Sequence, residues 1–534
     1  MSISASASEP TAIVASRQVT APGGGPRLVR NVVTNWGAFV FAAVVNFMLS
    51  PFIVRSLGAT AYGAFVLINS LVGYLGLLDL GVRGAVTRYV ARFHSSGEHD
   101  QASELTSAAL KIFGIAAIAA VVLSLALSAV ADRLFHVPPG FVTAVRIVAV
   151  IGGLNIAVAL IDGVLGGVII GLQRFDYTNA VDVVIGAVRA VIVVTALKMG
   201  EGIVVLAILQ LGSSIARLVV DYVICRRVYP QLDLRFRGRS EYVKLVLSFG
   251  LASSILHVAG QVMLFSDSIV IGMFLPVGMV TYFAIAANLT DYGRQVTSGI
   301  SRVLTPLVSA VEARGESAAI VRSLLVGARS TTILVLPVAV TFIIRGSTFI
   351  RLWMGAEYAS LSGQVLGVLA VFLACHAGYE VMTASMMGIN RHRGLIPVFV
   401  ADAACNVLLS VLLVPRIGIV GSALGTLIPQ LIMTLFVGPW YVRRELGIPL
   451  RTFWLNTHVR PLVAVLPFAS VSFFFEHWWP SPNLLVYFGQ IALTLPFAAL
   501  GAWLFGLSLE ERNVVAALFA RRSGRALAKG PIAS

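Results

Sequence analysis

The chain contains about fourteen long apolar segments, each close to the length of a membrane-crossing helix. A helix needs roughly 20 apolar residues to cross the hydrocarbon core of a bilayer. The apolar runs are continuous rather than alternating, which favours helices over the strands of a membrane barrel. The sequence therefore predicts an all-α, polytopic membrane protein with about 14 transmembrane helices. The segments cover residues 32–54, 61–82, 106–131, 145–170, 178–198, 202–224, 246–273, 279–300, 320–344, 360–387, 394–414, 418–440, 459–475 and 485–506.

The composition agrees with a membrane protein. Of 534 residues, 58% are hydrophobic and 12% are charged, whereas an ordinary soluble domain carries about 25% charged residues. Mean hydropathy is +0.90. The net charge of +15 raises the question of nucleic-acid binding, but the cations lie in short connections between apolar segments. That placement is typical of membrane topology, and we expect no nucleic-acid partner.

Lys and Arg are distributed unequally between alternate connections. The two tails and the even-numbered connections hold about 27 of them, and the odd-numbered connections about six. This asymmetry predicts that both termini lie in the cytoplasm. The six cations on the other side are Arg55, Arg133, Lys198, Arg345, Arg351 and Arg416.

The connections leave little room for an enzyme. The longest outer one, "IRGSTFIRLWMGAEYAS" (residues 344–360), has space for one small surface helix and no domain. The three cysteines, Cys225, Cys375 and Cys405, show neither disulfide nor metal spacing. Since the chain also lacks a nucleophile–base pattern, we expect no enzyme activity, metal or cofactor. A membrane polysaccharide polymerase or ligase is the least favoured function.

Several motifs recur at nearly one offset, which indicates two duplicated halves. "GLQRF" at residue 171 and "GINRH" at residue 388 lie 217 apart, and Asp182 and Asp402 lie 220 apart. Gly58 and Tyr62 recur at the same offset of 220, in "VGMVTYFAI". Because six spans is an even number, both halves enter the membrane from the same side, as a parallel repeat.

The repeat divides the chain into two six-helix lobes with additions. We expect a pseudo-twofold relation between the lobes, with a basic connector between them. The predicted parts are a disordered tail (1–30), an N-lobe (31–224), the connector (225–244), a C-lobe (245–440), two extra spans (441–506) and a basic cytoplasmic tail (507–534).

The motifs "RSLGATAYGAF", "LLDLGVRGAVTRYVA", "GLQRFDYTN", "LWMGAEYAS" and "VPRIGIVGSALGTL" give the chain a family likeness. It resembles the polysaccharide-biosynthesis, O-antigen flippase-like proteins, in the superfamily of the multidrug-and-toxin extruders and the lipid II flippase. The resemblance implies two lobes around a cavity that opens alternately to each side of the bacterial inner membrane. It implies a polyprenyl-pyrophosphate-linked oligosaccharide as cargo, with polysaccharide assembly proteins as further partners. A cation-coupled small-molecule exporter is the alternative.

Charged residues inside the apolar segments are the candidate site, because an intramembrane charge is costly and usually functional. Arginine suits a pyrophosphate, since its planar fork matches phosphate oxygens. Each of these arginines has an alternative role in a topology anchor or an interhelical ion pair. The candidate substrate ligands are Asp79, Arg83, Arg189, Arg217 and Arg294.

A second set of polar residues has other candidate roles. Buried carboxylates and histidines are candidates for coupling transport to H⁺ or Na⁺: Asp162, Asp182, Asp291, Asp402 and His257, with the pair His376–Glu380. Amides within the spans suit sugar hydroxyls, although such residues also serve as interhelical contacts. These amides are Asn35, Asn46, Asn155, Gln210, Gln261, Asn288 and Gln364.

Overall fold

The computed structural model describes residues 24–234 and 239–522, and all their side chains except those of 24–33, 251–257, 514, 515 and 518–522. The described residues are almost entirely helical and contain no strand. Eleven helices are long and apolar enough to cross a membrane, so the prediction of an all-α polytopic membrane protein is confirmed. The count of fourteen spans stays a prediction. Residues 1–23 of the expected tail lie outside the described residues.

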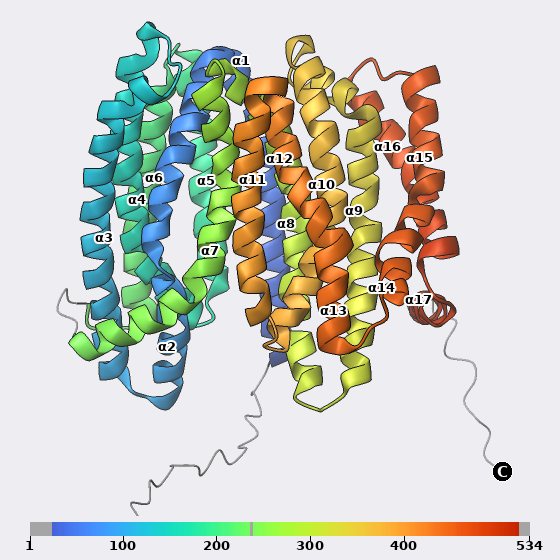
Figure 1. Cartoon of the computed structure of the whole chain (residues 1–534). Coiled ribbons are helices and arrows are strands. Elements are labelled where there is room, and N and C mark those ends of the chain that lie inside the picture. The colour runs from blue at the N-terminus through green and yellow to red at the C-terminus, as the bar shows by residue number, and fades with distance from the viewer. Residues whose placement is uncertain (1–23, 235–238, 523–534) are drawn as a thin grey trace, which may run out of the picture.

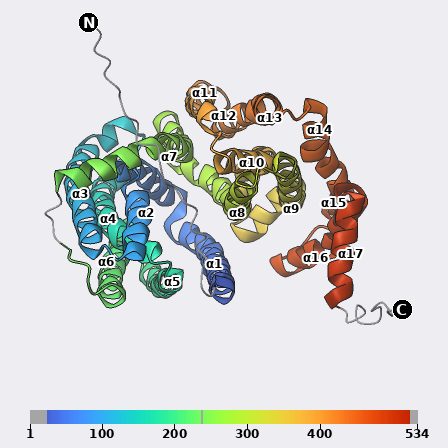
Figure 2. The ribbon, with the colours of Figure 1, turned by 90° about the horizontal axis from the view of Figure 1, so that it is seen from below.

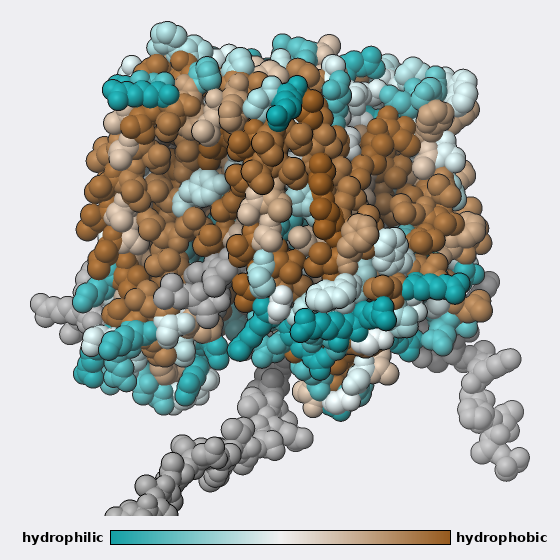
Figure 3. Space-filling model, in the orientation of Figure 1, coloured by the Kyte–Doolittle hydropathy of each residue, from teal (hydrophilic) through white to brown (hydrophobic). Residues whose placement is uncertain are grey.

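The helices stand side by side, and a broad apolar belt runs between two hydrophilic rims (Figures 1 and 3). Viewed along the helices, α2 to α6 form one group and α8 to α13 another (Figure 2). The N-lobe, the first group with α1, consists of α1 (Gly24–Gly73), η1 (Tyr74–Asp79), α2 (Val82–Ser96), α3 (His99–Leu134), η2 (Pro139–Phe141), α4 (Val142–Gly171), α5 (Phe175–Lys198) and α6 (Ile203–Val228).

The second half of the chain forms the C-lobe and a set of C-terminal helices at its side (Figure 2). The C-lobe consists of α7 (Ser240–Phe274), α8 (Gly278–Glu312), α9 (Ser317–Trp353), α10 (Ala356–Gly388), η3 (Arg393–Leu395), α11 (Ile396–Ile417), α12 (Ile419–Ile432), η4 (Met433–Val437) and α13 (Gly438–Leu446). The C-terminal helices are α14 (Leu450–Trp454), η5 (Leu455–Val459), α15 (Arg460–Trp478), α16 (Leu484–Gly501), η6 (Ala502–Gly506) and α17 (Leu509–Arg522).

Two boundaries differ from the sequence-based prediction. Helix α1 already begins at Gly24, within the expected tail. The second span was expected to run unbroken through Asp79 and Arg83, but the helix ends at Asp79, and Leu80 and Gly81 adopt left-handed conformations. Gly250 of α7 packs against this break so closely that a Cβ there would lie 2.1 Å from the Leu80 carbonyl oxygen. The break therefore serves the packing of α7 on the N-lobe.

The lobes meet at one end of the molecule, beside a kink in α1. The kink lies at Gly58, whose φ of 76° and ψ of 166° are accessible essentially to glycine alone. Next to it, the Arg55 guanidinium donates to the carbonyl oxygens of Trp353 and Met354 at 3.0 and 3.1 Å. Thr281 of α8 donates to the Ala59 carbonyl at 2.6 Å. These contacts close the Arg55 end of the interface between the lobes.

The C-terminal helices dock on α9 through two buried arginines. Arg345 was expected in an outer loop, but α9 runs on to Trp353 and buries it, because its guanidinium finds partners on α15, α16 and the turn between them. It contacts Glu476 at 3.3 Å, Ser481 at 2.8 Å and Gln490. No small surface helix forms between α9 and α10.

The second arginine, Arg329, holds α17, which lies within the expected C-terminal tail. It binds Glu511 and, at 3.1 Å, Asn456. Glu511 also accepts a hydrogen bond from the Ser508 backbone N–H at 2.7 Å, while Ser508 caps the helix in return. Burial raises the pKa of Glu511, but the hydrogen bonds from Ser508 and the charge of Arg329 outweigh it, so the pKa lies below its ordinary value.

This lowered pKa predicts an acid-sensitive contribution to stability. A carboxylate with a lowered folded pKa stabilises the fold above its ordinary pKa, and the contribution is lost as the pH falls through the folded value. We expect Glu511→Gln to lower the apparent melting temperature in detergent at neutral pH, with the difference shrinking below about pH 4. The control is Glu510→Gln, because Glu510 is exposed and its ion pair within the described part of the chain is with the exposed Arg322. A pH-independent difference would contradict the assignment.

Candidate functional site

A cavity of about 800 Å³ lies between the lobes, away from the closed Arg55 end. Its walls come from α1, α5 and α6 of the N-lobe and from α8 of the C-lobe. The lining combines apolar side chains with amides, a tryptophan and three arginines. The polar and aromatic lining residues are Asn35, Trp36, Phe39, Phe41, Asn46, Phe175, Asn179, Asp182, Arg189, Gln210, Ser213, Ser214, Arg217, Gln295 and Arg302.

Arg189 is a cation of this cavity with no counter-ion among the described residues. It extends from the middle of α5 and lines the cavity. No ion pair or hydrogen bond from its guanidinium occurs within the described part of the chain. Because an unpaired charge in a membrane protein requires water or a ligand, the cavity wall at Arg189 is suited to an anion.

Arg217 lies on α6 and is neutralised by three carboxylates. Its guanidinium binds Asp182 of α5, contacts Asp162 of α4 at 3.2 Å and contacts Asp221 at 3.5 Å. Asp221 is almost fully buried, and both of its oxygens lack a hydrogen-bond donor within the described residues. Arg217 thus serves mainly to hold buried carboxylates, although it also borders the cavity.

The C-lobe wall supplies a cation that the sequence analysis did not select. Arg302 of α8 lines the cavity, and its Nε donates to the Ser298 carbonyl oxygen at 3.2 Å. Gln295, two turns earlier, lines the same wall. Arg302 follows directly after the expected span 279–300, two turns beyond Arg294 on the same helix, and this spacing was the signal that could have identified it.

Amides and one tryptophan line the rest of the cavity. Asn179 donates to the side chain of Asn35 at 2.6 Å, which links α5 to α1. Asn46 and Gln210 line the cavity as well, and Trp36 adds an aromatic face. Such groups are the usual partners of sugar hydroxyls and sugar rings.

The remaining candidate ligands do not line this cavity. Arg83 and Asp79 pair at 3.7 Å across the break before α2, not within one helix. Arg294 pairs with Asp291 at 3.9 Å on α8. The side chain of His257 lies outside those that the structure describes.

Two further carboxylates lie buried in the C-lobe. Asp402 lies near the beginning of α11, as Asp182 does in α5, but it is 3% exposed. The sequence analysis missed Asp267 of α7, which accepts hydrogen bonds from Ser422 at 2.6 Å and Thr426 at 3.1 Å. Asp267 is far along the chain from the α12 hydroxyls that bind it, so no local sequence pattern could have identified it.

A family model described as polysaccharide biosynthesis protein matches residues 28–312. The uncharacterized membrane protein EpsK of Bacillus subtilis (strain 168) is 22% identical over 92% of this chain and 98% of its own. A Shigella flexneri protein whose name describes an O-antigen transporter is 18% identical over 78% of this chain and 98% of its own.

Solved structures share the fold at low sequence identity. The lipid II flippase MurJ in an inward closed conformation gives a TM-score of 0.68 at 13% identity, covering 93% of this chain and 100% of that one. A multidrug resistance transporter of the MATE family, in an inward-facing conformation, gives 0.64 at 15% identity, covering 78% and 98%.

Because their surroundings differ, replacing Arg189 or Arg217 by alanine should change stability differently. Arg217→Ala leaves buried carboxylates uncompensated, which costs on the order of 3–5 kcal/mol. Arg189→Ala removes an unpaired cation, so it should leave the apparent melting temperature unchanged or raise it. Thermal unfolding of both purified variants in detergent measures the difference. Adding Asp221→Asn to Arg217→Ala should restore part of the loss, whereas equal destabilisation by both arginine variants would contradict this account.

Proposed function

Because the chain belongs to the polysaccharide biosynthesis protein family, we propose that it is a flippase for a polyprenyl-pyrophosphate-linked oligosaccharide. It moves this lipid-linked glycan from the inner to the outer leaflet for surface polysaccharide biosynthesis. The observation that carries the proposal is the unpaired Arg189 in a cavity between two lobes. The names of the related O-antigen transporter and of the lipid II flippase with the same fold support it.

The cavity offers one pyrophosphate ligand from each lobe. Arg189 lies on α5 and Arg302 on α8, and no described carboxylate pairs with either of them. A guanidinium binds phosphate oxygens through two parallel charge-assisted hydrogen bonds. The anion therefore bridges the lobes and replaces the water that a large polar head group loses in the membrane.

The cavity amides bind the sugar part of the same cargo. Asn35, Asn46, Asn179 and Gln210 lie on the N-lobe side of the cavity, with Trp36 at its edge. Their donors and acceptors suit hydroxyl groups without selecting one glycan. Alternate opening at the two ends then moves the bound head group across the membrane, as in other transporters built from paired repeats.

The fold also fits a second function. The MATE-family structure shows that the same architecture occurs in a multidrug resistance transporter, so a cation-coupled small-molecule exporter is the alternative. The arginines favour the flippase, since a cavity lined by unpaired cations suits an anionic head group. A deletion strain separates the two: glycan retained on the cytoplasmic leaflet supports the flippase, and normal polysaccharide with drug hypersensitivity supports the exporter.

We further propose that the protein lies in the bacterial inner membrane with both termini in the cytoplasm. The arginine asymmetry supports this orientation. The closed Arg55 end then faces outward, and the cavity lies toward the cytoplasm. The connector between the lobes, whose residues 235–238 lie outside the described residues, is cytoplasmic as well.

Single arginine variants test cargo binding. Loss of a hydrogen bond to a charged group costs about 1.5–3 kcal/mol, so Arg189→Ala and Arg302→Ala should each weaken binding of a polyprenyl pyrophosphate about 10- to 150-fold. Arg→Lys should restore part of the affinity, since it keeps the charge and loses the fork. Binding to purified protein in detergent is the measurement. Arg416→Ala is the control, because Arg416 is exposed at the end of α11, and equal loss there would refute the assignment.

Cysteine accessibility tests the orientation. A single cysteine at position 240, in a chain whose three native cysteines are replaced, should resist a membrane-impermeant thiol reagent in intact cells. It should react once the membrane is permeabilised, because the start of α7 then lies in the cytoplasm. A cysteine at exposed Glu357, at the start of α10, is the matched control and should react from outside. Labelling at 240 in intact cells would overturn the topology.

A further inference from the structure

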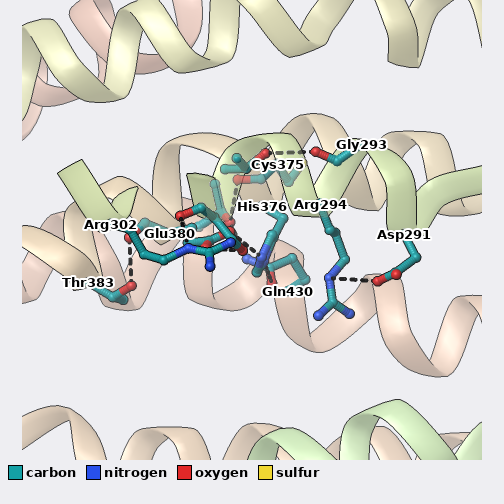
Figure 4. A network of polar contacts seen from close by, with 12 residues as sticks. Asp291, Gly293, Arg294, Arg302, Cys375, His376, Glu380, Thr383 and Gln430 are labelled. Carbon is teal, nitrogen blue, oxygen red and sulfur yellow. Dashed lines mark hydrogen bonds and ion pairs between the residues drawn. The ribbon is translucent and has the colours of Figure 1, made fainter. Parts of the chain in front are cut away.

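A histidine and a glutamate one turn apart on α10 form a polar pair inside the C-lobe. Nε2 of His376 lies 3.1 Å from Oε2 of Glu380, and each side chain is about one-fifth exposed, 21% and 19%. The Ser298 hydroxyl of α8 donates to Oε1 of Glu380 at 2.6 Å. Figure 4 shows the pair beside Gln430, with Arg294 and Arg302 nearby.

The orientation of the Gln430 amide is fixed by its neighbours. Its Nε2 donates to the hydroxyl of Thr434 at 2.8 Å. Thr434 donates its own proton to the Cys375 carbonyl oxygen at 3.3 Å. Because a hydroxyl carries one proton, Thr434 can only accept from Gln430. The amide oxygen therefore points at Nδ1 of His376, at 3.2 Å.

Both ring nitrogens of His376 consequently face oxygen atoms. A neutral imidazole has one N–H and an imidazolium has two. With Glu380 ionised, only the imidazolium donates to Gln430 and also presents a positive charge to the carboxylate, which it contacts as an ion pair rather than through an aligned hydrogen bond. With Glu380 protonated, the acid donates to Nε2 and the ring keeps Nδ1–H for Gln430. In both cases the pair holds one exchangeable proton. Without that proton, the imidazole is neutral beside a carboxylate, and at one of its two contacts a nitrogen lone pair faces an oxygen lone pair.

We propose that His376 and Glu380 form a proton-binding site in the C-lobe, occupied in this conformation and linked to the cavity. The ring of Phe372, one turn earlier on α10, stacks on the imidazole with the ring centroids 5.2 Å apart. The link runs through Ser298, whose hydroxyl binds Glu380 while its carbonyl oxygen accepts from Arg302. Proton occupancy thereby positions the C-lobe arginine of the cavity.

Other charged groups surround the site. Among the described residues of α12 and η4, the uncharged Gln430 contacts the pair and Thr434 lies behind it. The two buried arginines of α9 are engaged with the C-terminal helices. These surroundings leave His376 and Glu380 in direct contact with each other rather than with a competing ion. The charged side chains next to the pair are Arg294 and Arg302 from α8 and Asp402 from α11, and Arg294 is itself paired with Asp291 (Figure 4).

Loss of the proton breaks one of the two contacts. The histidine then separates from Gln430 of α12 or from Glu380. Either change shifts the pair that joins α10 to α12, and it shifts the Glu380 carboxylate that accepts from Ser298 of α8. The inference that proton release accompanies cargo release rests on the proposed function. The inference that the His376–Glu380 pair holds a proton does not.

Nuclear magnetic resonance tests the proton directly on the purified full chain, labelled with ¹⁵N-histidine and ¹³C-glutamate. At neutral pH we expect either an imidazolium with a carboxylate or a neutral imidazole with a carboxylic acid, assigned by loss of the signals in His376→Gln and Glu380→Gln. A neutral imidazole beside a carboxylate would overturn the proposal. Gln430→Leu removes the Nδ1 acceptor, so the proton should be lost at a lower pH in that variant, and an unchanged titration would also count against it.

A binding measurement tests the link to the cavity. Wild-type affinity for a polyprenyl pyrophosphate should fall about tenfold as the site deprotonates, a usual size for coupling between sites. His376→Gln and Glu380→Gln should flatten this pH profile, whereas the exposed His477→Gln should keep it. Unchanged profiles in all variants would disprove the link. A wild type that binds no pyrophosphate lipid would instead refute the proposed cargo and leave the resonance result standing.

Discussion

The hydrocarbon core of a membrane contains no water, so each charge inside it must find a partner in the protein, and this constraint organises the structure. Arg345 and Arg329 attach the C-terminal helices to α9 because the membrane offers their charges nothing else. Arg217 draws three carboxylates from α4, α5 and α6 together. Arg189 has no such partner among the described residues, which is why we propose it as a ligand of the cargo.

Helix α8 carries much of the polar chemistry. It is more polar than the eleven described helices that are long and apolar enough to cross a membrane, because it contains several charged and hydroxyl residues. One face places Arg302 in the cavity, and another places Ser298 on Glu380. Near its amino-terminal end, Thr281 reaches Ala59 of α1. We infer that α8, which joins the closed end, the cavity and the proposed proton-binding site, couples the three.

Hydropathy and loop charge were sufficient to predict the helical membrane fold. Both patterns are set by the membrane and water around the chain rather than by tertiary contacts. They also selected Arg189, Arg217 and Asp182, which do line the cavity. Sequence alone could not separate the free Arg189 from the neutralised Arg217, since the carboxylates lie on three helices. Arg345 was misplaced in a loop because charge was taken as a mark of exposure, whereas its partners lie more than a hundred residues away.

Buried ion pairs and hydrogen bonds to backbone carbonyl oxygens differ in the free energy needed to break them. Within the C-lobe and its C-terminal helices, buried ion pairs cannot separate without leaving charges unpaired, so these parts move as one body. Between the lobes, Arg55 and Thr281 bind only backbone carbonyl oxygens. At an end that opens to water, these bonds are exchanged for bonds to water, at a net cost of about 1.5–3 kcal/mol for each guanidinium bond and about 1 kcal/mol for the hydroxyl bond. The chain therefore places its strong interactions inside the moving parts and its weak ones where the parts must separate.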